Sequence, residues 1–206
     1  MNLEELFARY QRWYREIYLQ ELLDELMGGD PEGMEEFAED GWVEPLGSLH
    51  RLGPVQLTQA QKTHGDFPAA YCDLLAQVGT GTLLCANEEE PTEHEFLHPD
   101  AIDMERQALM SWLSPEGLKR IRDDQGIDVS KVIPFLKPDG TCWVVLSNQR
   151  EGDDRTFVFD HGFEGSYDRL LCGPESLETF LENYLRRAMF KNPLDGFNCW
   201  EAPQAE

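Results

Sequence analysis

Three β-rich segments that follow one another constrain the fold of this chain more than any other feature. Residues 129–136 and 141–146 consist mainly of β-branched, aromatic and other apolar side chains. The four residues between them, Lys137-Pro138-Asp139-Gly140, suit successive positions of a turn. A third segment of the same kind, 155–160, follows the polar run 148–154. The sequence therefore predicts a β-hairpin followed by a third strand.

Helical periodicity marks the segments on both sides of these strands. Apolar residues at i, i+3, i+4 and i+7 predict a helix between Pro68 and Gly79, and a longer apolar stripe predicts a closing helix after the capping residue Ser176. Near-helical spacing predicts a long amphipathic helix over residues 3–26, ended by Gly28-Gly29. We also expect short helices over 31–37, after Thr58, over 99–113 and over 114–121. A strand is expected over 80–86, and a loop or short strand over 41–53. Residues 87–95 should form a solvated loop, and residues 161–174 an irregular stretch.

The net charge limits which partners the chain can bind. Seventeen Lys and Arg residues stand against forty Asp and Glu residues, a formal net charge of −23, and residues 1–100 alone carry 21 acidic and 5 basic side chains. Affinity for nucleic acid or anionic lipid comes from clustered cations, so this charge argues against both as partners. The acidity serves solubility, or it steers a cationic partner, and the composition leaves both interpretations open.

Cysteine use and the amino terminus predict a cytoplasmic protein. The five cysteines form an odd set without a C-x-x-C pair, so we expect reduced thiols; they are Cys72, Cys85, Cys142, Cys172 and Cys199. The first residues lack the cationic start and apolar stretch of a signal peptide, and no apolar run approaches the roughly 20 residues that span a bilayer. Export by a pathway without such a signal stays open.

One motif suggests metal chemistry. His94-Glu95-Phe96-Leu97-His98 matches H-E-x-x-H, in which a helix places two imidazoles on one face for zinc and leaves the Glu as general base. Pro99 follows directly and disfavours helical angles at His98, and positions 101 and 104, where longer zinc motifs continue, are Ala and Met. We therefore expect a polar loop that runs into a helix start, and we keep a zinc metalloenzyme only as an alternative.

Other candidate groups have simpler interpretations. Asp160-His161 could pair a carboxylate with a base, but no nucleophile accompanies them, and local backbone hydrogen bonds explain both. Asp123-Asp124 and the acids at 151–154 lack the spacing of a calcium-binding loop, and no phosphate-binding glycine loop is present. The sequence therefore predicts no catalytic residue, no cofactor and no bound metal.

Several segments, in order, resemble the SUKH superfamily of Smi/Knr-like proteins. The resemblance covers about residues 55–190, with Phe159 where the family usually has Trp. The matching stretches are Phe67-Pro68-Ala69-Ala70-Tyr71-Cys72-Asp73-Leu74-Leu75 before Gly79-Thr80-Gly81; Val132-Ile133-Pro134-Phe135, Asp139-Gly140 and Trp143-Val144-Val145-Leu146; Phe157-Val158-Phe159-Asp160-His161; and Ser176-Leu177-Glu178-Thr179-Phe180-Leu181.

The resemblance implies an α+β fold, with helices around a mostly antiparallel sheet. It divides the chain into an acidic helical extension at 1–54, a SUKH-like domain at 55–192 and a tail at 193–206, with an insertion around 87–125. We expect the extension to pack on the core, because its opening helix carries too much apolar surface to leave in water. Many bacterial members are immunity proteins that neutralise a cognate toxin, often a nuclease or deaminase, and others are regulatory interaction modules.

The expected function is therefore non-enzymatic protein binding, with a toxin domain as the partner and a regulatory or scaffold role as the alternative. Loops on a rigid scaffold tend to carry recognition residues. We expect partner contacts from two acidic loops, one with Glu88, Glu89, Glu90, Glu93 and Glu95, the other with Glu151, Asp153 and Asp154. If the partner is cationic, these charges act through long-range steering, so association should slow as salt rises.

Overall fold

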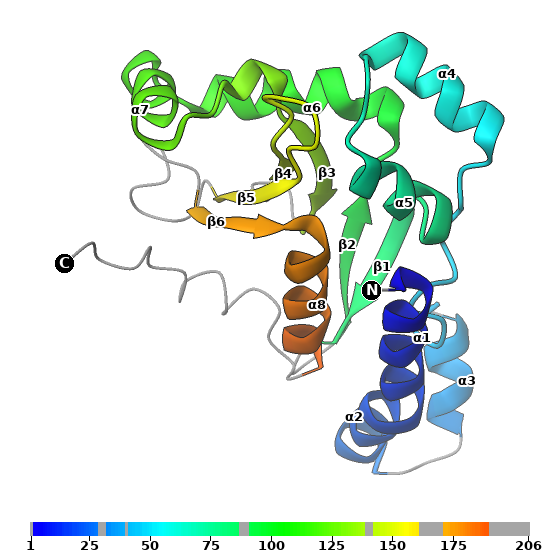
Figure 1. Ribbon diagram of the computed structural model, residues 1–206. Helices are drawn as coiled ribbons and strands as arrows, with labels where there is room; N and C mark the ends of the chain where they lie inside the picture. The colour runs from blue at the N-terminus through cyan, green and yellow to red at the C-terminus, as the bar shows by residue number, and fades with distance from the viewer. Residues whose placement is uncertain are drawn as a thin grey trace.

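The fold is α+β, as the sequence predicts: helices surround one six-stranded antiparallel sheet (Figure 1). The computed structural model describes residues 2–28, 32–39, 41–86, 91–138, 142–160 and 171–189. Within them the strands lie in chain order: β1 (Gly81–Cys85), β2 (Thr92–Phe96), β3 (Ile133–Lys137), β4 (Cys142–Leu146), β5 (Arg155–Asp160) and β6 (Leu171–Ser176).

The predicted hairpin and third strand are confirmed as β3, β4 and β5, but two strands differ from the sequence prediction. β2 falls in the segment expected to be a solvated loop, although its burial alternates, with His94 and Phe96 inward and Glu93 and Glu95 outward. β6 falls in the segment expected to be irregular, because it contains Gly173 and Pro174. Such residues are tolerated at a sheet edge, which is where β6 lies.

The helices follow the predicted periodicity closely. α5 (Ala69–Gln77) and α8 (Leu177–Ala188) confirm the two strongest predictions, and the Ser176 side chain caps α8 by accepting a hydrogen bond from the Thr179 amide. No helix among the described residues is both long and apolar enough to cross a membrane. The other helical elements are α1 (Leu3–Trp13), the π-helical turn η1 (Tyr14–Tyr18), α2 (Leu19–Met27), α3 (Glu32–Glu39), α4 (Pro54–His64), η2 (Pro99–Ala101), α6 (Ile102–Trp112), α7 (Pro115–Gln125) and η3 (Val129–Lys131).

The opening helix of the sequence analysis contains a π-helical turn in its middle. Tyr10, Tyr14 and Tyr18 are each four residues apart and almost wholly buried. A π turn takes more residues per turn than an α-helix, so Tyr14 and Tyr18 stay on the same face. Their rings lie 4.9 Å apart between centroids. The wider turn therefore keeps the aromatic stripe directed into the core.

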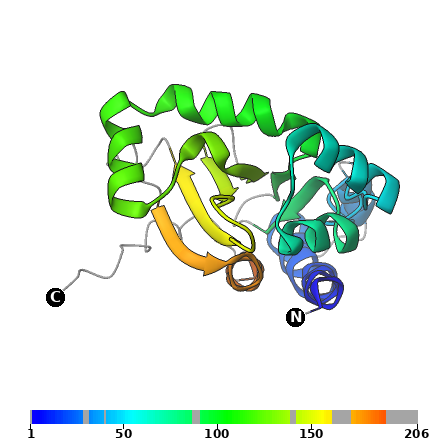
Figure 2. The same ribbon diagram turned by 45° about the horizontal axis from the view of Figure 1, so that its top comes forward.

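The two faces of the sheet carry two separate cores, because side chains alternate along each strand. On one face Leu83, Phe96 and Val144 pack with residues of α1, α5 and α8. On the other, Trp143 and Phe159 pack with residues of α6, α7 and η3. Figure 2 shows α6 and α7 on one side of the sheet and α1 and α8 on the other. Both faces of the central strands are therefore covered.

The opening helix packs on the sheet instead of standing apart from it. Leu3, Leu6 and Phe7 belong to the same buried cluster as the first sheet face. The Tyr10 hydroxyl donates to the Leu84 carbonyl at 2.9 Å and accepts from the Ala86 amide at 3.2 Å, so it satisfies backbone groups at the end of β1. α1 and α8 lie side by side (Figure 1). The predicted tail, 193–206, lies outside the described residues.

The segment between α3 and α4 covers the outer edge of β1. His50 and Thr80 form an antiparallel bridge with N–H···O distances of 2.8 and 3.0 Å, and the Leu84 amide donates to the Pro45 carbonyl at 3.0 Å. The sequence leaves a loop or a short strand open for this segment, and the structure has turns with a single bridge. Because this segment also contacts α1, it joins the opening helix to the sheet.

Candidate functional site

The H-E-x-x-H motif does not form a zinc site, because it lies on a strand. His94 is in β2, and His98 caps the 3-10 turn η2 two residues after the strand ends. An extended chain advances about 3.3 Å per residue, so the two imidazoles are roughly 13 Å apart along it, too far for one metal ion. Among the described residues, no three His, Cys, Asp or Glu side chains are grouped to hold a metal. The expected helix start after Pro99 is present, whereas the expected loop before it is a strand.

His94 belongs to a buried polar cluster between the sheet and α8. Its ring nitrogens contact the Tyr184 hydroxyl and, at 3.3 Å, Thr92 Oγ1. The same Tyr184 hydroxyl lies 3.4 Å from Cys85 Sγ. Burial raises the pKa of the Cys85 thiol to about 12 and that of Tyr184 well above its ordinary value. A thiol with that pKa is protonated at neutral pH, so Cys85 is not a nucleophile in this setting.

Two further pairs from the sequence analysis are not brought into a site. Asp160 ends β5, opposite Cys142 in register, and His161 lies outside the described residues. Asp123 and Asp124 are exposed near the end of α7, where Lys119 pairs with Asp123 one helical turn away. Such an exposed i, i+4 pair contributes a few tenths of a kcal/mol to helix stability and needs no functional explanation.

The acidic residues predicted to bind a partner have different surroundings. Glu88, Glu89 and Glu90 lie outside the described residues. Glu93 and Glu95 are exposed, but on β2 and not in a loop, which corrects the prediction. Lys137, opposite Glu95 in register, is held by Glu105 at 3.1 Å. Glu95 and Glu93 therefore present carboxylates from a rigid strand.

The second predicted loop connects β4 and β5, and only part of it faces solvent. Glu151 is exposed and Asp154 is half-buried. Asp153 is only 4% exposed, which corrects the expectation that it faces a partner. Its carboxylate accepts hydrogen bonds from Ser147 Oγ at 2.6 Å and from Arg155 Nε and Nη2 at 2.8 and 3.0 Å. Asp153 therefore fixes the loop from inside.

These contacts predict acid sensitivity at Asp153. Burial by itself raises the pKa of this carboxyl, but the hydrogen bonds from Arg155 and Ser147 outweigh it and bring the pKa to about 2. A carboxyl whose pKa is lowered in the folded state stabilises the fold at pH values above its ordinary pKa near 4. This stability is lost as the pH falls through about 2. Asp153→Asn should therefore lower the free energy of unfolding by about 2 kcal/mol at pH 7 and flatten its pH dependence between about pH 4 and 2.

Urea denaturation at several pH values measures this effect. The matched control is Asp154→Asn, because Asp154 is the neighbouring carboxylate and is half-buried, whereas Asp153 is buried. Equal losses for the two variants, or an unchanged acid dependence in Asp153→Asn, would contradict the role assigned to Asp153.

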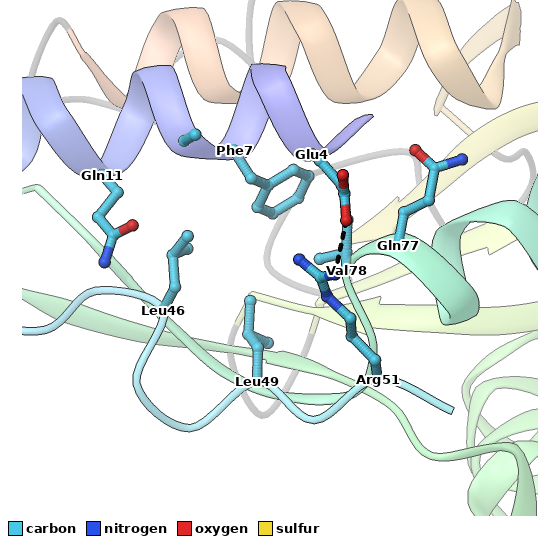
Figure 3. A pocket seen from close by; sticks show the side chains of 9 residues that line it. Glu4, Phe7, Gln11, Leu46, Leu49, Arg51, Gln77 and Val78 are labelled. Atoms are coloured by element: carbon cyan, nitrogen blue, oxygen red, sulfur yellow. Dashed lines mark hydrogen bonds and ion pairs between the residues drawn. The ribbon is translucent and has the colours of Figure 1, made fainter. Parts of the chain in front are cut away.

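A hollow lies along the seam between α1 and the rest of the fold (Figure 3). Its volume is about 170 Å³. Phe7 points from α1 toward Leu46 and Leu49 of the segment before α4, and Val78 closes the floor after α5 (Figure 3). The remaining lining residues are polar or small: Glu4, Ala8, Gln11, Arg51 and Gln77. We call this the seam hollow; it has an apolar floor and a polar rim.

Hydrogen bonds and ion pairs hold the rim of the seam hollow in place. Arg51 Nη1 lies 2.5 Å from a carboxylate oxygen of Glu4, and Gln11 Nε2 donates to Glu44 at 3.2 Å. Gln77 Oε1 accepts from the Leu3 amide at 3.2 Å, which ties the start of α1 to α5. The hollow is therefore largely preformed, as binding sites usually are.

A second, smaller hollow shares Gln77 with the seam hollow. Its volume is about 70 Å³, and it is lined by Leu3, Ala70, Asp73, Leu177 and Glu178 together with Gln77. Asp73 is exposed on α5, and Glu178 is half-buried in the first turn of α8. We call this the acidic hollow. Both hollows are lined by a residue of the first turn of α1, and they share one glutamine.

Neither hollow is visible in the sequence. The lining residues come from helices and turns that are up to 175 residues apart, as Leu3 and Glu178 are. The 41–53 segment has no periodicity that would mark Leu46 or Leu49 as part of a site. No protein-family model matches the chain, and no curated protein matches it. The functional interpretation therefore depends on the geometry of this chain and on the resemblance described above.

Proposed function

We propose that the chain is a non-enzymatic, cytoplasmic protein-binding module of the immunity type, which neutralises a cognate toxin domain by direct binding. The SUKH-like motifs support this proposal through their positions. The Phe67–Leu75 stretch leads into and forms most of α5, the two hairpin motifs lie on β3 and β4, the aromatic motif on β5 and the Ser176 motif on α8. Each motif thus occupies an element of the same kind as the family pattern requires.

The observation that carries the proposal is the exposure of Glu93 and Glu95 on a rigid strand, in a chain of net charge −23. Carboxylates on a fixed scaffold give a directed negative potential, which accelerates encounter with a cationic protein and can occupy its phosphate-binding groove. Toxins that degrade nucleic acid need cationic surfaces for their substrate. A cationic nuclease domain is therefore the class of partner that this surface fits best.

Charge reversal on β2 tests the steering directly. Glu93→Lys together with Glu95→Lys should lower the association rate with a cationic toxin domain by roughly tenfold at low salt, while the dissociation rate changes less. The difference should shrink as salt rises, because screening shortens the range of the field. Surface charges contribute little to stability, so the variant should remain folded.

Surface plasmon resonance or stopped-flow fluorescence measures both rates. The control is Glu116→Lys with Asp124→Lys, which makes the same charge change at exposed positions of a different element, α7. If the two double variants slow association equally, only the net charge matters and β2 is not part of the binding face.

Co-expression tests the proposed function itself. The proposal predicts that a large protein with a toxin-like carboxy-terminal domain is encoded beside the gene of this chain, and that domain is the toxin to test. We expect the chain to restore growth of cells that express this domain and to elute with it as one complex from a sizing column. Failure of both would contradict the immunity role, and a pull-down dominated by a housekeeping protein would indicate a regulatory or scaffold module instead.

A further inference from the structure

The second histidine of the H-E-x-x-H motif lies close to a histidine from another part of the chain. His98 caps η2, and His64 is the last residue of α4, which lies beside the start of α6 (Figure 1). The carboxylate of Asp100, in η2, approaches both rings. Its Oδ1 is 3.9 Å from His64 Nε2, and its Oδ2 is 3.4 Å from His98 Nδ1. The fold thus brings two imidazoles and one carboxylate to the junction of α4 and η2.

One nitrogen of the His64 ring is buried without a hydrogen-bond partner among the described residues. The His64 side chain is only 5% exposed. Its Nδ1 lies 3.2 Å from Asp103 Oδ2, and because an ionised carboxylate only accepts hydrogen bonds, Nδ1 carries the proton. In the neutral ring Nε2 then holds a lone pair, and it faces the Asp100 carboxylate at a distance too long for a hydrogen bond. A buried lone pair that faces a negative charge is unfavourable unless a cation lies between them.

The spacing of these atoms suits a small divalent cation. Zinc binds imidazole nitrogen at about 2.0–2.1 Å and carboxylate oxygen at about 2.0–2.2 Å, so one ion links two such atoms that are up to about 4.2 Å apart. The 3.9 Å between His64 Nε2 and Asp100 Oδ1 is within this limit. The 3.4 Å between Asp100 Oδ2 and His98 Nδ1 matches the roughly 3.4 Å between two ligands of a zinc tetrahedron.

We propose that His64, Asp100 and His98 bind a divalent transition-metal ion, with zinc as the expected ion and water as a further ligand. No group of three ligands is preassembled among the described residues, so His98 has to turn toward the ion. Its side chain is 50% exposed, and turning it gives up only a 3.3 Å contact with the Asp100 amide. Two imidazoles, one carboxylate and water form a ligand set that zinc accepts. We call this the α4–η2 site.

The residues behind His64 hold its ring in the orientation that metal binding needs. Asp103 Oδ2 accepts from His64 Nδ1, and Arg106 Nη1 pairs with the other Asp103 oxygen at 2.9 Å. Arg106 Nε in turn donates to the Val132 carbonyl at 2.8 Å. A carboxylate behind a metal-binding histidine fixes its tautomer and increases the basicity of the ligating nitrogen. These supporting contacts are already in place, and they direct Nε2 toward Asp100.

The α4–η2 site joins a weakly held helix to the rest of the fold. Ala60 is the one buried residue that α4 contributes, and a helix with so little buried surface opens easily. The Asp100 side chain is 80% exposed, which gives an ion from solvent a path to the site. A bound ion ties the end of α4 to η2 and therefore stabilises α4 in its packed position. This role is structural, and it is independent of the toxin binding proposed above.

The first test titrates Co²⁺ into the purified full chain, because Co²⁺ replaces zinc and its visible absorption reports the number and kind of its ligands. We expect saturable binding of about one equivalent, which Zn²⁺ reverses. His64→Gln and His98→Gln should each weaken Co²⁺ binding at least about tenfold. The matched control is His50→Gln, an exposed histidine of the 41–53 segment, which should change it less than about twofold.

Absence of saturable binding, or binding that His64→Gln and His98→Gln leave unchanged, would overturn the α4–η2 site. Circular dichroism checks that the variants are folded. If His64→Gln is unfolded, Asp100→Asn takes its place, because it removes a ligand from an exposed position and should also weaken Co²⁺ binding at least about tenfold.

The second test measures the effect of Zn²⁺ on α4 by hydrogen exchange. We expect Zn²⁺ to slow exchange of the α4 amides in the native chain, to leave the α7 amides unchanged, and to have no effect on α4 in Asp100→Asn. The alternative is a His64 ring that is protonated on both nitrogens and paired with the two aspartates. A ¹⁵N spectrum in which the ring stays so at excess Zn²⁺, with α4 exchange unchanged, would overturn the inference.

Discussion

Replacing Gly81 by alanine should lower the free energy of unfolding by about 3 kcal/mol or more. Gly81 has φ of +126°, a conformation that only glycine adopts without strain, and a Cβ at this position would overlap the Ser48 carbonyl oxygen. The backbone of the 41–53 segment would have to move away from β1. That movement would break the His50–Thr80 bridge and loosen the seam with α1.

Urea denaturation monitored by circular dichroism measures the loss. The control is Gly126→Ala at the end of α7, where φ is +67° and a Cβ would meet nothing within 4 Å. That variant carries only the cost of the left-handed conformation, about 1 kcal/mol. A Gly81→Ala variant no less stable than Gly126→Ala would show that close packing of the 41–53 segment on β1 contributes little.

Replacing Glu105 by alanine should cost about 3 kcal/mol. Glu105 is buried on α6, where it accepts a hydrogen bond from Trp143 Nε1 at 2.7 Å and pairs with Lys137 Nζ at 3.1 Å. Removing the Glu105 carboxylate leaves the buried indole N–H and the half-buried ammonium without this partner. Losing a hydrogen bond costs a buried group more free energy than it costs an exposed one, because water does not replace the partner. Lys137 is partly exposed, so the expected loss in free energy of unfolding lies at the lower end of the range for breaking buried ion pairs.

Glu105→Gln separates the two contributions. The amide oxygen can still accept from Trp143, whereas the ion pair with Lys137 is lost, so we expect an intermediate cost of about 1 to 2 kcal/mol. Chemical denaturation gives the free energies of unfolding of both variants. A Glu105→Ala variant within about 0.5 kcal/mol of the native chain would mean that α6 is held to the sheet by apolar packing alone.

The elements that the sequence predicts correctly are those whose apolar pattern is long or carries clear end signals. α5 and α8 show a helical stripe between a proline or serine start and a defined end, and β3 and β4 lie on either side of a sequence segment whose Pro, Asp and Gly predict a turn. β2 was missed because its outward residues are glutamates, so its alternation resembles a solvated acidic run. β6 was missed because Gly and Pro usually interrupt strands and are tolerated only at an edge.

The candidate site was less predictable than the fold. Exposure of Glu93, Glu95 and Glu151 follows from charge alone, since an unpaired carboxylate is costly to bury. Burial of Asp153 does not, because it depends on Arg155 and Ser147 closing around the carboxylate after the β4–β5 loop has formed. The two hollows depend on tertiary contacts between α1, α5, α8 and the 41–53 segment, and no local pattern contains that information.

Neutralisation by direct binding is tested most directly by titrating the activity of the purified toxin domain with the purified chain. The toxin domain is the one that the proposal predicts beside the gene of this chain, and its expected nucleic-acid cleavage or deamination supplies the signal. We expect activity to fall linearly and to reach background at about one equivalent of folded chain, as for a tight stoichiometric inhibitor. Full activity at a roughly tenfold excess of folded chain, at low salt where steering is strongest, would contradict the immunity function.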